Sequence, residues 1–122
     1  MNSFIVVILP QASEDITRNA DWWAENHSLD QALAWTEVIQ EQLQQLGSMP
    51  ERFGLAPENA KFEIEIRQQP IGIGAKKTYR AVFTIRDRSV FILAVRRAAQ
   101  DALSADEIQD TLTELKRIGD RP

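Results

Sequence analysis

Basic residues gather in one β-rich stretch of this chain of 122 residues. Between positions 67 and 97 there are eight lysines and arginines against a single acid, Asp87, although the whole chain has a formal net charge of −4. The eight are Arg67, Lys76, Lys77, Arg80, Arg86, Arg88, Arg96 and Arg97. Guanidinium and ammonium groups bind anions such as phosphates and carboxylates. The local excess of positive charge therefore predicts an anionic target for this stretch.

The rest of the chain is acidic, and this excludes some classes of protein. A protein that coats nucleic acid is normally basic overall, so the net charge of −4 argues against that class. The absence of cysteine removes disulfides and thiolate chemistry, and it fits a reducing cytoplasm, where we expect the protein to act. The early apolar run, Phe4 to Leu9, is too short for a signal peptide or a membrane span.

No metal or cofactor site is expected. His27 is the single histidine, and without cysteine the chain has too few ligands for a structural zinc site. The segment Gly72-Ile73-Gly74 lacks the third glycine of a dinucleotide-binding loop, so it predicts an ordinary turn.

A strand and two amphipathic helices are predicted for the first half of the chain. The run Phe4–Leu9 is apolar and rich in β-branched residues, which is typical of a buried strand. Pro10 suits the first turn of a helix that runs to about Asn26. Ser28 and Gln31 form a capping box that opens a second helix, and the glycine and proline after it end that helix.

Three strands and a last helix follow a loop at residues 47–60. The alternation of apolar and charged residues predicts a half-exposed strand at Phe62–Arg67, and a loop follows at Pro70–Gly74. Two further strands are expected at 77–86 and 89–97, joined by a tight Asp87-Arg88 turn. Ser104 and Glu107 form a second capping box.

The order β-α-α-β-β-β-α predicts an α+β fold in one domain, residues 1–122. It consists of an N-terminal strand, an αα-hairpin, a three-stranded antiparallel meander that completes one sheet, and a C-terminal helix.

From about Phe4 to Leu103 the chain resembles the RelE/ParE toxin superfamily of bacterial type II toxin–antitoxin modules, often labelled plasmid stabilisation proteins. The resemblance rests on the order of elements together with three short motifs, which are the Leu46…Pro50…Gly54 loop, the Tyr79-Arg80 pair and the Val95-Arg96-Arg97…Asp101 ending. It implies a toxin that inhibits growth, and a cognate antitoxin whose segment wraps the toxin. We expect that segment to be acidic where it meets the basic 67–97 surface.

Two targets follow from the resemblance. RelE-like members cleave mRNA on the ribosome, and in that case Arg80 matches the arginine that braces the scissile phosphate, with Arg97 and Tyr79 as its catalytic companions. Arg67 matches an exposed arginine of the second strand. ParE-like members instead poison DNA gyrase.

Departures from the cleaving pattern favour the ParE-like alternative. Glu63 and Glu65 stand where cleaving members carry lysines, and carboxylates there repel a phosphate backbone. Arg97 replaces a histidine, and an arginine stays protonated and is a poor proton shuttle. A ribosome-dependent nuclease and a detoxified interaction module remain open alternatives.

The candidate residues also have structural interpretations. Arg80 could pair with Glu63 or Glu65 across the sheet. Arg96 and Arg97 are adjacent, so only one of them can share Arg80's face within a regular strand. The full candidate binding set is Arg67, Lys76, Lys77, Arg80, Arg96 and Arg97, of which the two lysines more often mark a solvated loop. Trp23 and Trp35 suit core packing, whereas Trp22 lies off the apolar stripe and suits a partner contact.

Overall fold

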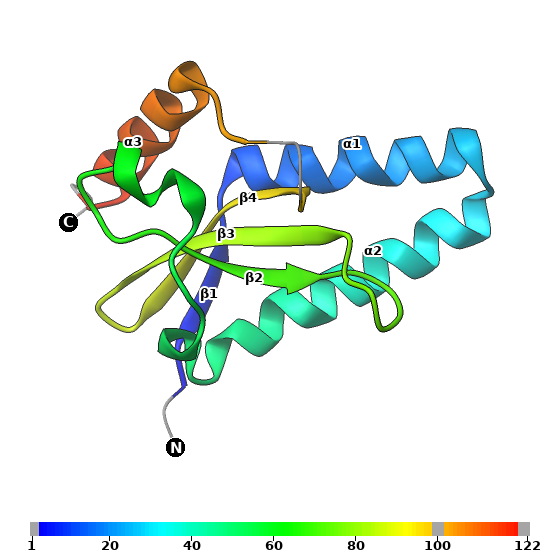
Figure 1. The fold of residues 1–122 in the computed structure, drawn as a ribbon, viewed down its shortest axis with the longest axis horizontal. Coiled ribbons are helices and arrows are strands. Elements are labelled where there is room, and N and C mark those ends of the chain that lie inside the picture. The colour runs from blue at the N-terminus through cyan, green and yellow to red at the C-terminus, as the bar shows by residue number, and fades with distance from the viewer. Residues whose placement is uncertain (1–2, 99–101, 120–122) are drawn as a thin grey trace.

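The computed structural model describes residues 3–98 and 102–119, and a four-stranded sheet forms its centre (Figure 1). The strand order is β1-β4-β3-β2, with β1 parallel to β4 and the other neighbours antiparallel. The strands are β1 (Ile5–Ile8), β2 (Arg67–Ile71), β3 (Tyr79–Arg86) and β4 (Ser89–Arg97).

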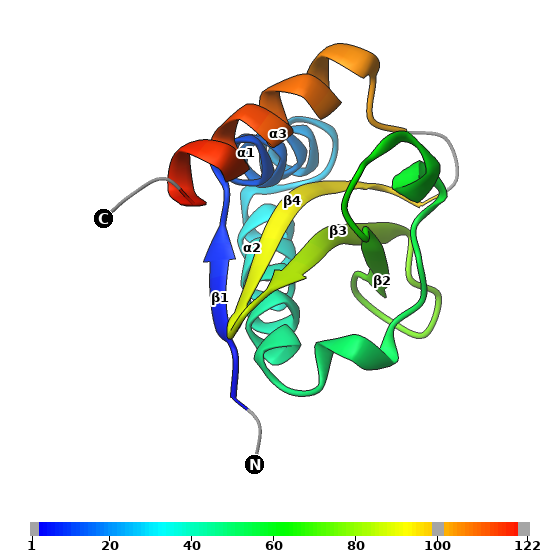
Figure 2. The ribbon, with the colours of Figure 1, turned by 90° about the vertical axis from the view of Figure 1, so that its left-hand side faces the viewer.

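Helices cover both faces of the sheet. The hairpin of α1 (Pro10–Asn26) and α2 (Leu29–Gln44) lies along one face, and α3 (Ala105–Gly119) lies on the other (Figures 1 and 2). Three short 3-10 turns lie between α2 and β2, at Gln45–Gly47, Pro50–Arg52 and Pro57–Lys61. None of the helices in the described part of the chain is long and apolar enough to cross a membrane.

Each face of the sheet has its own apolar core. On the hairpin face, Trp35, Ile39 and Leu43 of α2 pack with Tyr79 and Phe83 of β3. On the other face, residues of α3 and of the loop after α2 pack with the alternate residues of β3 and β4, among them Leu103, Ile108, Leu115, Ile66, Val82 and Leu93. The α+β architecture predicted from the sequence is confirmed.

The predicted helix starts are confirmed in their capping contacts. The Ser28 hydroxyl accepts a hydrogen bond from the Gln31 N–H at 3.1 Å. At α3 the box closes in both directions, because the Glu107 N–H donates to Ser104 Oγ and the Ser104 N–H donates to Glu107 Oε1, at 3.2 and 2.9 Å. These local bonds satisfy N–H groups that the first turn of a helix leaves without partners.

The predicted strand at Phe62–Arg67 is wrong. Its residues alternate in burial as expected, but the chain there is irregular, and the ladder with β3 begins only at Arg67 and continues through Pro70 to Ile71. The Ile66 N–H donates to Asn59 Oδ1, and the Ile66 carbonyl accepts from the Ala56 N–H. A local loop therefore takes the place of a strand partner. Pro70, predicted as loop, is tolerated in β2 because β2 is an edge strand.

A β-bulge in β4 decides which arginine lies on which face. Phe83 pairs with Ile92 and Val82 with Ala94, so Leu93 is an extra residue opposite β3. β4 has nine residues against eight in β3. The bulge shifts the alternation of side chains by one residue. As a result Arg96 lies opposite Arg80, and Arg97 lies opposite Tyr79.

Candidate functional site

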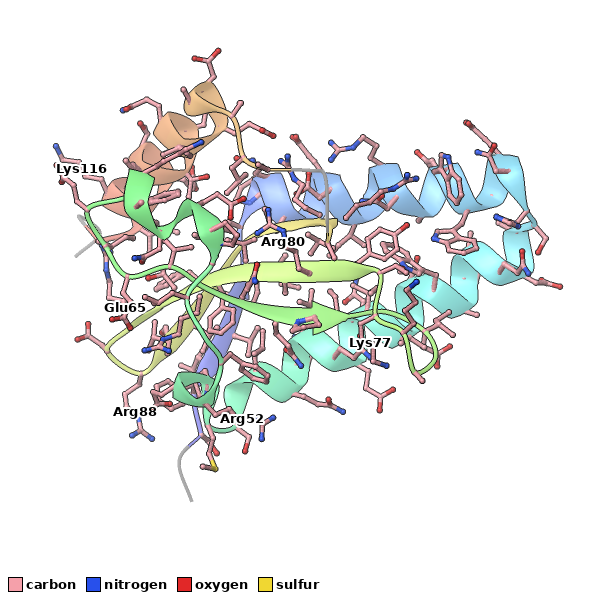
Figure 3. The ribbon with its side chains drawn as sticks, in the orientation of Figure 1. Arg52, Glu65, Lys77, Arg80, Arg88 and Lys116 are labelled. Carbon is pink, nitrogen blue, oxygen red and sulfur yellow. The ribbon has the colours of Figure 1, made fainter. Side chains whose placement is uncertain are left out.

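Arg80 lies inside the protein and binds a carboxylate that the sequence did not indicate. Its guanidinium is in a bidentate pair with Glu58, with Nη1 at 2.8 Å from Oε1 and Nη2 on Oε2. Arg80 is 6% exposed and Glu58 2% exposed. Nη1 also donates to Gln68 Oε1 at 3.2 Å, and the Leu103 N–H donates to Glu58 Oε2 at 3.1 Å. Figure 3 shows Arg80 over β3, where these segments meet.

Arg96 is the cross-strand neighbour of Arg80 and has two carboxylates of its own. Its Nε donates to Asp15 Oδ2 of α1 at 2.9 Å, and its two terminal nitrogens donate to Glu107 of α3. Asp15 Oδ2 also accepts the Val95 N–H at 3.0 Å. β1, the neighbour of β4 on this side, ends at Ile8, opposite Ile92. The Val95 N–H therefore has no strand partner there, and the Asp15 carboxylate accepts its hydrogen bond instead.

These contacts define an arginine cluster, in which the cations Arg80 and Arg96 meet the carboxylates Glu58, Asp15 and Glu107. Arg18 also pairs with Asp15, at 2.7 Å, so three positive charges face three negative charges and the cluster is neutralised. A buried charge is stable only when it is paired and hydrogen-bonded, and each member of this cluster meets that condition.

The cluster holds Glu58 and Glu107 in the ionised form. Burial alone would raise the pKa of Glu58, but the hydrogen bonds from Arg80 and Leu103 outweigh it and lower that pKa. The hydrogen bond from Arg96 lowers the pKa of Glu107 to about 2. Burial disfavours the charged form of Arg96, yet the hydrogen bonds to Glu107 and Asp15 raise the pKa of its guanidinium.

Tyr79 and Arg97 lie on the hairpin face of the sheet, opposite to Arg80. Tyr79 is buried and packs against Trp35, with 5.1 Å between the ring centroids. Arg97 is exposed, and its guanidinium carbon lies 5.0 Å from the centroid of the Trp22 ring. The structure thus brings Tyr79 and Arg97 together and does not bring Arg80 to them, and their shared catalytic role stays a prediction.

The other basic candidates lie apart from the cluster. Arg67 donates to the Phe53 carbonyl and pairs with Glu65, both within the loop that leads to β2. Lys77 donates to the carbonyls of Gly72 and Gly74, so it closes the turn between β2 and β3 (Figure 3). Lys76 is exposed, and no carboxylate in the described part of the chain pairs with it.

The prediction that Arg80 pairs with Glu63 or Glu65 is wrong. Glu65 pairs with Arg67, and Arg80 pairs with Glu58, a residue of the Pro57–Lys61 turn. Glu58 lies in an irregular segment, so no periodic pattern marked it. The spacing along α1 could have indicated that Asp15 is buried, because Asp15 lies three residues after Ala12 on the side of the helix that faces the core. Gln100 and Asp101 of the predicted ending motif lie outside the described residues.

Comparison with known proteins agrees with this fold and with the resemblance seen in the sequence. A chain from the chromosomal ParDE toxin–antitoxin system of P. aeruginosa superposes with a TM-score of 0.63 and 17% identity, covering 80% of this chain and 99% of that chain. At such identity the match shows a shared fold. No curated protein sequence matches the chain. The sequence model for the ParE toxin of the type II toxin–antitoxin system parDE matches residues 6–102, which is most of the chain. The chain therefore belongs to the ParE toxin family and is a toxin component of the type II class.

Proposed function

We propose that this toxin arrests growth by binding a protein target, with DNA gyrase as the favoured target, and that it does not cleave mRNA. The observation that carries the proposal is the arginine cluster. Arg80, the residue expected to brace a scissile phosphate, is buried in a bidentate pair with Glu58.

A phosphate cannot take the place of Glu58 at low cost. Separating a buried ion pair leaves a buried charge without its partner, which typically costs about 3–5 kcal/mol. The cations of the cluster are also balanced by its carboxylates, so the cluster presents no net positive charge to an incoming phosphate. Leu103 and α3 cover the same face, and Leu103 donates directly to Glu58. These features argue against binding of an RNA backbone there.

Among residues 3–98 and 102–119, proton transfer for RNA cleavage also lacks a suitable group at this face. Attack by a 2′-hydroxyl needs a base, and the leaving oxygen needs an acid. His27, the single histidine, lies at the turn between α1 and α2, where its ring packs 4.7 Å from that of Trp23. Glu58 and Glu107 have lowered pKa values and bind arginines, so they are weak bases.

Membership of the ParE toxin family supports gyrase as the target and a cognate antitoxin as the natural inhibitor. The similar chain of known structure comes from a toxin–antitoxin system of the same name, which supports the same pairing for this chain.

The test is tightly controlled expression in a bacterial host, with pulse labelling of new DNA and new protein. We expect DNA synthesis to fall first while protein synthesis continues. An early fall in protein synthesis with intact DNA synthesis would overturn the proposal in favour of a ribosome-dependent nuclease. Growth without arrest would instead indicate a detoxified interaction module.

A further inference from the structure

A groove on the hairpin face of the sheet is lined by aromatic residues and has cations at its rim. Two cavities of about 380 and 210 Å³ share Trp23, Thr78 and Tyr79 as lining residues, so they lie next to each other. We call this region the indole groove. The aromatic and cationic residues that line it are Trp22, Trp23, Trp35, Tyr79, Lys76 and Arg97.

The aromatic rings of the groove form two contacting pairs. Trp35 contacts Tyr79, and Trp22 contacts Trp23 edge to face with centroids 5.3 Å apart. Arg97 stacks over Trp22 at the outer end. Tryptophan, tyrosine and arginine are the residue types that most often dominate the energy of protein–protein binding. A groove built from all three suits an inserted apolar side chain.

Two of the tryptophans that line the groove have buried donors without acceptors in the described part of the chain. The indole nitrogens of Trp23 and Trp35 are buried, and neither has a hydrogen-bond partner in the described part of the chain. A buried donor without an acceptor costs free energy.

The described residues give the groove a positive charge. None of its lining residues is acidic. Within residues 3–98 and 102–119, neither Lys76 nor Arg97 has an ion pair with a carboxylate, in contrast to Arg80 and Arg96. Two exposed cations beside an apolar opening match a partner that carries carboxylates next to an apolar side chain.

We propose that the indole groove binds a segment of the cognate antitoxin in which an aromatic or aliphatic side chain is flanked by carboxylates. The apolar side chain enters between Trp23, Trp35 and Tyr79, and the carboxylates meet Lys76 and Arg97. The inference rests on the proposed function in one respect, which is that the toxin has a cognate antitoxin.

The chain reports on this site directly, because its three tryptophans, Trp22, Trp23 and Trp35, all line the groove. The experiment titrates purified toxin with purified cognate antitoxin whose own tryptophans, if any, are replaced by phenylalanine. We expect saturable change in tryptophan emission and protection of the emission from iodide quenching. We also expect the affinity to fall as sodium chloride rises.

Two changes test the residues. Trp22→Ala, and separately the double change Lys76→Glu with Arg97→Glu, are each expected to weaken antitoxin binding about tenfold or more. The matched control is Lys61→Glu with Lys116→Glu, which alters the net charge equally at two exposed lysines away from the groove. Figure 3 shows Lys116 at the end of the molecule far from Lys77. Near-ultraviolet circular dichroism of each variant checks that the fold is intact.

Unchanged affinity in both groove variants, or an equal loss in the control, would overturn the groove as the binding site. In that case the pulse-labelling result would still stand, so the proposed function would survive. If the antitoxin does not bind the wild-type toxin at all, both the groove and its premise are contradicted.

Discussion

Two basic regions lie on opposite faces of the sheet, and they differ in how their charges are used. In the arginine cluster, Arg80 and Arg96 are buried and bound by carboxylates of the same chain. In the indole groove, Lys76 and Arg97 are exposed and have no carboxylate partner in the described residues. Arg96 and Arg97 are adjacent in the sequence but have different surroundings, because the pleat of a strand sends adjacent side chains to opposite faces.

The comparison shows that a count of basic residues does not locate a binding surface. The stretch from 67 to 97 carries eight basic residues, yet the two arginines at its most motif-like positions stabilise the fold. The positive charge that a partner can meet lies on the other face. Burial and pairing, which depend on residues distant in sequence, decide between the two uses.

The largest expected effect comes from breaking the pair in the arginine cluster. Glu58→Ala leaves the buried Arg80 guanidinium without its carboxylate and removes the acceptor of the Leu103 N–H. We expect a loss of about 3–5 kcal/mol in the free energy of unfolding, measured by urea denaturation at pH 7.

A companion variant sharpens that result. Replacing both partners with methionine removes the buried charges together, so it is expected to cost less than Glu58→Ala alone. A single substitution that costs under about 1 kcal/mol would mean that the pair is not what stabilises this face.

A smaller and pH-dependent effect is expected at Glu107. Its folded pKa of about 2 is below the ordinary value of 4.5, so its pairing with Arg96 stabilises the protein fully above pH 4.5. This contribution is lost as the pH falls from about 4.5 to about 2. The Glu107 side chain is 33% exposed, so solvent screening reduces the contribution to about 1–2 kcal/mol.

Glu107→Gln tests this directly by urea denaturation over a range of pH. The variant should be less stable than wild type at pH 7, and the difference should vanish near pH 2. A difference that stays constant with pH would contradict the role of the ionised carboxylate.

The smallest effect on stability is expected in the groove. Arg97→Ala removes an exposed guanidinium stacked on Trp22, and such contacts contribute about 0.5–1 kcal/mol. For a chain of this size the midpoint of thermal unfolding should fall by no more than about 4 °C. A loss as large as that of Glu58→Ala would mean that Arg97 is a structural residue, and the contrast between the two regions would fail.

The sequence predicted the order of elements well, because helices and strands have local signals. Ser28 and Ser104 mark helix starts through contacts within three residues, and Pro10 does so because its fixed φ suits the first turn; each is found at a helix start. The alternation at residues 62–66 was misleading, since an irregular loop against a core also alternates in burial.

The partners of the arginines could not be predicted in the same way. Glu58 is 22 residues from Arg80 in the sequence, and Asp15 is 81 residues from Arg96. Such pairs depend on how the loop and α1 pack on the sheet. The bulge at Leu93 was also hidden, and it alone moves Arg96 to the face of Arg80 and Arg97 to the face of Tyr79.

The most direct test of the central claim uses the purified toxin in two parallel reactions. One reaction follows DNA supercoiling by gyrase, and the other follows mRNA on programmed ribosomes. Because the arginine cluster is already neutralised by its own carboxylates, we expect inhibition of supercoiling and intact mRNA. Cleavage of the mRNA with unimpaired supercoiling would contradict the account.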